Sequence, residues 1–138
     1  MKILVITPLH HISGVAEALE KIGEVTYLDD PTLEEVCNLI PSFEIIFTNP
    51  NKSKVFIGKE LLEAAQNLKV ICTASTGTNH IDKLYAEKLQ IPILALTEER
   101  EVINKISSTA EQAFALTLAG LRHISAGHSA VLKGEWDY

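Results

Sequence analysis

The chain has 138 residues, of which 46% are apolar and 22% are charged, and its formal net charge is −6. A chain of this length can bury one core, and this apolar share excludes wholesale disorder. The excess of acidic side chains argues against a nucleic-acid partner, because binding along phosphate backbones requires the opposite sign of charge.

Strand and helix patterns alternate along the first hundred residues. Ile3–Thr7 is almost continuously apolar and β-branched, which is typical of a strand covered on both faces. Further strands are predicted over residues 24–28, 43–49, 69–74 and 91–96. Helices are predicted over residues 14–23, 29–40, 58–68 and 81–90.

This alternation, with short connections, predicts a parallel sheet with right-handed crossovers. The expected fold class is α/β, with a flavodoxin-like, doubly wound, five-stranded parallel sheet in residues 1–100. In its second helix we expect Asp29 or Asp30 as the N-cap and Pro31 at the first helical position.

The pattern changes after Leu96. Residues 97–108 are charged and predicted to form a loop, so Glu98, Glu99 and Glu101 are interpreted as a solvated acidic cluster. Residues 109–124 predict one long helix that is apolar nearly all round and therefore buried on more than one side. The segment that follows has no clear period.

Two features indicate a cytoplasmic protein. Cys37 and Cys72 lie among apolar neighbours, as reduced core thiols do. No apolar run reaches the roughly 20 residues of a membrane-spanning helix, and the apolar N-terminus is too short for the core of a signal peptide. We therefore expect no membrane partner.

Ligands of doubly wound sheets bind beyond the carboxyl ends of the strands. The loops at that edge are predicted to be Thr7–Gly14, Thr48–Lys54 and Thr73–Asn79. In the third loop, Ser75, Thr76 and Gly77 are small enough for their backbone N–H groups to approach a carboxylate or a phosphate. The alternative is a plain strand-to-helix turn capped by Asn79 or Asp82.

Other candidate sites are weaker. Asn49, Lys52 and Lys54 follow the third strand and are candidates to contact an anionic ligand. The five histidines show no zinc-ligand spacing, so no metal site is expected. The chain has no dinucleotide fingerprint, P-loop or nucleophile elbow, and no acidic pair after the first strand that would indicate a phosphorylated receiver domain.

Two segments in order resemble the D-isomer-specific 2-hydroxyacid dehydrogenases. The family's loop of the type Gly-x-Gly-x-x-x-Ile-Asp is matched by Thr76–Asp82, its strand after Ile-Pro by Ile91–Pro92, and the start of its crossing helix by Ala110–Glu111. The resemblance covers the whole chain in layout and is specific over residues 68–122. Ser75 replaces the first glycine, and residues 97–102 replace a Pro-Gly turn.

The resemblance implies the substrate-binding domain of an NAD(P)-dependent enzyme that interconverts 2-hydroxy and 2-keto acids, as phosphoglycerate dehydrogenase does. It assigns residues 1–100 to that domain, 101–125 to an interdomain helix with its lead-in loop, and 126–138, with Trp136, to a linker toward a coenzyme domain. The coenzyme motif and the catalytic residues of the family lie beyond this chain. We therefore expect no catalytic residue and no bound NAD or NADP here, and no activity of the chain alone.

In the family, the loop that matches Ser75, Thr76 and Gly77 donates N–H groups to the substrate carboxylate, and Asn49 is the further substrate contact that we expect. The particular acid, and NAD against NADP, stay open. The alternative is a stand-alone flavodoxin-like module that binds small anions or regulates a partner, and the reading frame downstream of Tyr138 distinguishes the two. We expect self-association through the apolar helix, either as a homodimer or as an aggregate.

Overall fold

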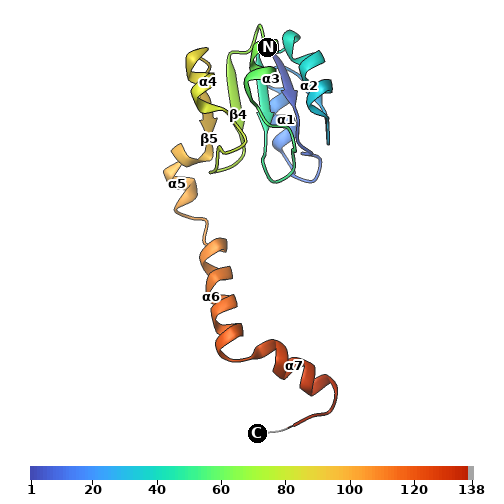
Figure 1. Cartoon of the computed structure of the whole chain (residues 1–138), viewed down its shortest axis with the longest axis vertical. Helices are drawn as coiled ribbons and strands as arrows, with labels where there is room; N and C mark the ends of the chain where they lie inside the picture. Colours follow the sequence, from blue (N-terminus) through green and yellow to red (C-terminus); the bar gives the residue numbers. More distant parts are fainter. Residues whose placement is uncertain (137–138) are drawn as a thin grey trace. The chain divides into compact units, whose positions relative to one another are not determined.

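The computed structural model describes residues 1–136 and divides the chain into two compact units, Met1–Glu99 and Arg100–Tyr138. The first unit contains a five-stranded sheet in the order β2-β1-β3-β4-β5, in which every neighbouring pair is parallel (Figure 1). The strands are β1 Lys2–Val5, β2 Glu24–Tyr27, β3 Ile45–Thr48, β4 Val70–Thr73 and β5 Ile93–Ala95. The predicted five-stranded parallel α/β fold is confirmed.

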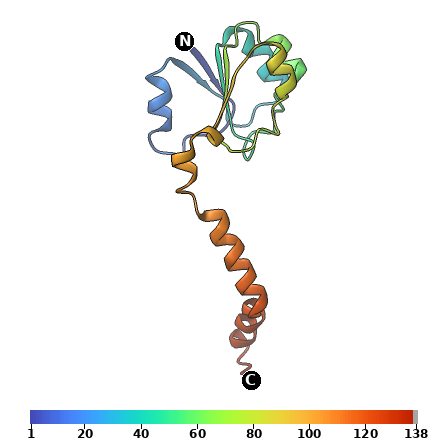
Figure 2. The same cartoon turned by 90° about the vertical axis from the view of Figure 1, so that its left-hand side faces the viewer.

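Helices cover the two faces of the sheet unequally. On one face, α2, α3 and α4 pack over Leu4, Ile46 and Ile71, which lie opposite one another on β1, β3 and β4 and are all fully buried. On the other face, α1 packs over Ile3 and Val5. Figure 2 shows α1 apart from the other three helices of this unit, across the sheet. Their bounds are α1 Val15–Glu20, α2 Leu33–Leu39, α3 Lys59–Ala64 and α4 Lys83–Lys88, with a 3₁₀ turn, η1, at Ile40–Ser42.

The start of α2 differs from the prediction. Its N-cap is Thr32, whose hydroxyl accepts a hydrogen bond from the Glu35 amide at 3.2 Å, while the Glu35 carboxylate accepts one from the Thr32 amide at 2.7 Å. This reciprocal pair satisfies two backbone donors, which neither Asp29 nor Asp30 does for this helix. The Asp29 or Asp30 cap is therefore wrong, and Pro31 precedes the helix.

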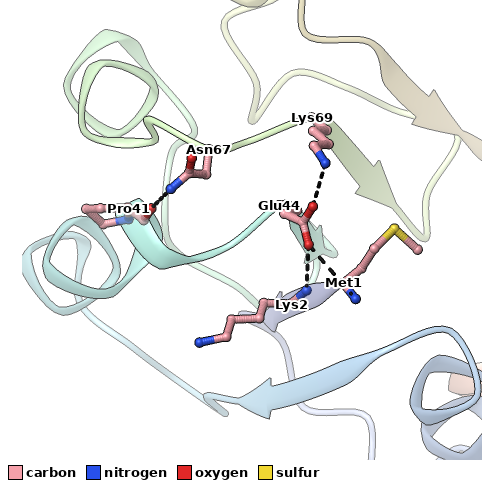
Figure 3. Close-up of polar contacts among 6 residues, drawn as sticks. All are labelled: Met1, Lys2, Pro41, Glu44, Asn67 and Lys69. Carbon is pink, nitrogen blue, oxygen red and sulfur yellow. Dashed lines mark hydrogen bonds and ion pairs between the residues drawn. The ribbon is translucent and has the colours of Figure 1, made fainter.

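Glu44 joins three strands at the amino edge of the sheet. Its carboxylate accepts a hydrogen bond from the Lys2 amide at 3.1 Å and pairs with the Lys69 ammonium group (Figure 3). Its backbone carbonyl accepts a further bond from the Lys69 amide at 2.7 Å. These contacts hold the pKa of Glu44 below its usual value, first through the hydrogen bond from Lys69 and then through that from Lys2.

We expect part of the stability to be lost in acid through Glu44. Because its pKa is lowered in the folded state, its contribution is present above the ordinary carboxyl pKa of 4.5 and is lost as the pH falls through the lower folded value. Chemical denaturation of the wild type and of Glu44→Gln between pH 7 and 3 measures this. The variant should show the shallower decline below pH 5, and equal slopes would contradict the assignment.

The second unit is helical. It contains α5 Arg100–Ile103, α6 Ser108–Leu121 and α7 Ile124–Leu132, and a 3₁₀ turn, η2 Leu96–Glu98, precedes it in the first unit. Residues 97–108 thus include short helical turns where the sequence predicts only a loop. The helix expected over 109–124 corresponds to α6, but it ends at Leu121, because His123 adopts φ 51° and separates α6 from α7.

Gly134 explains why α7 ends at Leu132. Gly134 adopts φ 77°, and its amide donates to the Val131 carbonyl at 3.0 Å, which satisfies a carbonyl left open at the helix end. Helix α7 occupies much of the segment in which the sequence shows no period. Residues 137 and 138 of the expected linker lie outside the described residues.

Burial in α6 differs from the expectation as well. No side chain between Ser108 and Leu121 is buried, and Phe114 and Leu121 are each 71% exposed. The apolar side chains that predicted a buried helix therefore form an exposed surface of this unit. Among residues 1–136, the helices lack the combination of length and apolar character needed to cross a membrane.

Candidate functional site

The carboxyl edge of the sheet brings the predicted loops together. The strand order reverses between β1 and β3, and β4 lies next to β3 with Thr48 opposite Thr73. The Ala74 amide donates to the Thr48 carbonyl at 3.0 Å. Since the polypeptide continues directly from Thr48 into Asn49 and from Ala74 into Ser75, the loop after β3 and the loop after β4 are neighbours at this edge.

Two carbonyl groups of the loop after β4 are held by internal hydrogen bonds. The Ser75 carbonyl accepts from the Leu96 amide at 3.1 Å, and the Gly77 carbonyl accepts from the Ser75 hydroxyl at 2.7 Å. In a trans peptide, the N–H of the next residue points away from the carbonyl. The amides of Thr76 and Thr78 therefore point away from these internal partners.

The backbone amides of this loop are left without protein partners. Across residues 1–136, the N–H groups of Ser75, Thr76 and Gly77 donate no hydrogen bond to a protein group. Thr76 and Gly77 are exposed, and a Cβ placed on Gly77 would meet nothing within 4 Å. We name these three residues the cradle loop. A row of open N–H groups is the kind of site that an anion occupies.

The alternative interpretation of this loop, a strand-to-helix turn, correctly predicted that one of its polar residues caps the next helix. Asp82 is the N-cap of α4, and its carboxylate accepts from the Tyr85 amide at 3.0 Å, whereas Asn79 does not cap the helix. This cap lies beyond the cradle loop in sequence and leaves its amides open. A capped turn and an anion site are therefore compatible in this segment.

Two of the polar residues after β3 are partly occupied by contacts with other protein groups. The Asn49 side-chain oxygen accepts from the Asn51 amide at 3.0 Å, so its amino group is the part available to a ligand. The Lys54 ammonium pairs with the Asp30 carboxylate at 3.1 Å, and Lys52 is exposed. Lys52 takes part in none of the ion pairs among the described residues, so its charge is available to a ligand.

Sequence reasoning missed the polar side chains beneath the cradle loop. Thr73 is buried, and its hydroxyl lies 2.7 Å from the Ser75 hydroxyl and 3.2 Å from His80 Nε2. Burial lowers the pKa of His80. The Thr48 hydroxyl is also buried and, within residues 1–136, has no hydrogen-bond partner. The only sequence signal was a threonine ending each of two neighbouring strands.

A small groove adjoins the cradle loop. It has a volume of about 230 Å³ and is lined by Phe47, Cys72 and Leu94, which face one another across three strands, together with Thr73, Ala74 and Glu99 among others. A larger hollow of about 520 Å³ contains Pro92 and Ile93 at the amino end of β5, on the far edge of the sheet. The larger of the two hollows therefore lies away from the open N–H groups. The presence of these hydrogen-bond donors favours the smaller groove as the ligand site.

The described residues give no indication of metal or thiol chemistry. Residues 1–136 contain no cluster of histidine, cysteine and acidic side chains that could hold a metal ion. Cys37 and Cys72 are free and half-buried, and burial raises the pKa of both thiols, for Cys37 with a smaller contribution from Glu60. Both are therefore poor nucleophiles.

Known proteins resemble the chain along nearly its whole length. The family described as D-isomer specific 2-hydroxyacid dehydrogenase, catalytic domain, matches residues 3–114. D-3-phosphoglycerate dehydrogenase of Methanocaldococcus jannaschii is 30% identical over 137 residues, which are 99% of this chain and 24% of that protein. Formate dehydrogenase 1 of Saccharomyces cerevisiae is 30% identical over 129 residues, 90% of this chain and 32% of that protein.

Solved structures show the same relation. The NAD-dependent formate dehydrogenase of Staphylococcus aureus, solved with NAD, superposes with a TM-score of 0.74 at 26% identity, covering 99% of this chain and 43% of that one. The chain thus covers between 24% and 43% of the length of these relatives.

Proposed function

Because the chain belongs to the D-isomer specific 2-hydroxyacid dehydrogenase family, we propose that it binds the substrate of an enzyme that interconverts a 2-hydroxy acid and a 2-keto acid. The chain corresponds to the catalytic, substrate-binding domain of its relatives and to only part of their length. The relatives named above as phosphoglycerate and formate dehydrogenases act, by those names, on carboxylates. This supports a carboxylate as the ligand.

The substrate carboxylate binds at the cradle loop. The observation that carries this proposal is the row of open N–H groups at Ser75, Thr76 and Gly77, beside a groove of about 230 Å³. Hydrogen bonds from backbone N–H groups to an ionised carboxylate are stronger than those between neutral groups. The amino group of Asn49, on the neighbouring loop, is the further polar contact that we assign to the substrate.

The coenzyme belongs to a part of the enzyme beyond these 138 residues. The matched part is only 24% of the Methanocaldococcus relative and 43% of the Staphylococcus one, which supports an additional domain that supplies NAD or NADP as the hydride carrier. In this arrangement α6 crosses between domains and the segment that contains Trp136 is the linker. The free cysteines support a reducing, cytoplasmic location.

Removing one cradle amide should weaken carboxylate binding. Thr76→Pro deletes the N–H group and Thr76→Ala keeps it, so the pair separates backbone from side chain. We expect Thr76→Pro to lose about tenfold or more in affinity for glyoxylate, the effect of one hydrogen bond to a charged group. Amide chemical shifts of the 138-residue chain, recorded during a glyoxylate titration, measure it.

Two outcomes would contradict this assignment. One is equal weakening by both variants, which would place the effect in the side chain. The other is a set of glyoxylate-induced shifts that gathers around Pro92 rather than around residues 75–77. Calorimetric titration of the same chain with NAD should give no binding heat, because the proposed coenzyme site lies elsewhere.

Self-association should occur through the apolar surface of α6. Phe114, Leu116, Leu118 and Leu121 are each more than half exposed, and a surface of this kind favours association. Leu121→Glu should shift sedimentation velocity profiles toward the monomer. Gln112→Glu introduces the same charge on the same helix without removing an apolar side chain, and it should leave the profile unchanged. A monomeric wild type at high concentration would refute the prediction.

A further inference from the structure

A continuous line of hydrogen-bonding groups runs beneath the cradle loop. It begins at His80 Nε2, passes at 3.2 Å to the Thr73 hydroxyl and at 2.7 Å to the Ser75 hydroxyl, and ends at 2.7 Å on the Gly77 carbonyl. Three different backbone segments are linked in this way: the last residue of β4, the loop itself and the turn before α4. The direction of each bond follows from the protons available.

The Gly77 carbonyl fixes the direction of the whole line. It has no proton, so the Ser75 hydroxyl must donate to it, and this uses the one proton of that hydroxyl. Thr73 must then donate to Ser75, which uses the one proton of Thr73. His80 Nε2 must therefore carry a hydrogen and donate to Thr73.

The other ring nitrogen is consistent with this assignment. If Nε2 carries the proton of a neutral imidazole, Nδ1 is an unprotonated acceptor. Nδ1 is buried and, among residues 1–136, has no hydrogen-bond partner. A proton there would have no acceptor among those residues. Burial of the ring, which lowers the pKa of His80, also favours the neutral form.

We propose that His80 is a positioning residue for the cradle loop, acting through Thr73 and through the Ser75 hydroxyl to hold the Gly77 carbonyl inward. This rests on the proposed carboxylate site. With the Ser75 carbonyl held by the Leu96 amide, two carbonyls of the loop are turned away from the ligand side. Their repulsion of a carboxylate is removed, and the intervening amides stay open.

Ser75 connects the two ends of this line, because its hydroxyl contacts both the Thr73 hydroxyl and the Gly77 carbonyl. A glycine at this position would have no hydroxyl to connect Thr73 with Gly77. The serine therefore gives a hydrogen-bonded loop in place of the conformational freedom of a glycine. Holding the loop in its binding conformation before the ligand arrives lowers the ordering cost of binding.

The first measurement is the protonation state of His80. Long-range ¹H–¹⁵N correlation spectra of the 138-residue chain near pH 7 report which ring nitrogen carries the hydrogen. We expect the neutral form protonated on Nε2. An Nδ1-protonated ring or an imidazolium would overturn the proposal, and this result does not depend on whether any carboxylate binds.

The second measurement compares matched variants in the glyoxylate titration. Thr73→Val removes the hydroxyl at constant shape, and His80→Leu removes the ring donor. Each should weaken binding by about two- to tenfold, as expected for losing a neutral hydrogen bond, with faster motion of residues 75–77 in ¹⁵N relaxation. Thr73→Ser and His80→Gln keep a donor in place and should restore most of the affinity.

The outcomes separate this proposal from the carboxylate site itself. Native affinity and native loop motion in folded Thr73→Val would overturn the positioning role. A wild type that binds no glyoxylate but shows the Nε2 proton and a rigid loop would refute the carboxylate site and leave the hydrogen-bonded line established. If Thr73→Val does not fold, the wild-type protonation state and the His80→Leu and His80→Gln pair decide.

Discussion

Replacing Leu61 by alanine is expected to lower the free energy of unfolding by about 2–5 kcal/mol. Leu61 lies in α3, is fully buried, and belongs to the core cluster between the sheet and helices α2, α3 and α4. Truncation removes transfer free energy and leaves a cavity that the surrounding side chains fill only in part. Urea denaturation followed by circular dichroism measures the change.

Leu84 offers a matched control for this experiment. It makes the same leucine-to-alanine change in a neighbouring short helix, α4, but is 81% exposed. Leu84→Ala should therefore change the unfolding free energy by no more than about 0.5 kcal/mol. Similar losses in the two variants would mean that helix propensity, rather than burial, dominates, and that α3 does not cover the sheet.

Alanine at Gly23 is expected to destabilise the fold by about 1–3 kcal/mol through overpacking. A Cβ at this position would lie 2.2 Å from the Met1 carbonyl oxygen, which already accepts the Glu24 amide at 2.9 Å where β1 meets β2. One of the two backbones must shift to relieve the contact. Thermal unfolding of Gly23→Ala, with amide exchange of β2 residues, locates the strain.

The cradle loop supplies the comparison for Gly23. Gly77→Ala makes the same substitution where nothing lies within 4 Å and where no left-handed φ is required. It should change stability by no more than about 0.5 kcal/mol. A large loss at Gly77, or none at Gly23, would show that the backbone paths differ from those described.

The fold followed from local pattern to a large extent. The β-branched runs around Ile3, Ile45 and Ile71 form strands in which successive side chains point to opposite faces of the sheet. One face is covered by α2, α3 and α4, and the other by α1 or by a groove. The errors lie at element ends. The sequence does contain the signal for the capping box at Thr32 and Glu35, which is a threonine followed three residues later by glutamate.

The helical segment beyond residue 100 was predicted less well. The break at His123 depends on a left-handed conformation of a non-glycine residue, for which composition gives no warning. Gly134, just after the last turn of α7, was a usable end signal. Apolar character predicted burial for α6, but burial depends on what packs against a helix, and its own sequence does not contain that information.

Amino-acid types alone indicated where a ligand could approach: small residues after the fourth strand of a parallel sheet, with Asp82 available as the next helix cap. They did not reveal which N–H groups stay open or which way the carbonyls face. Those properties depend on hydrogen bonds from Leu96 and from the line through Ser75, Thr73 and His80. The chain must fold before these groups meet, because a hydrogen bond requires a separation of about 3 Å whatever the distance along the sequence.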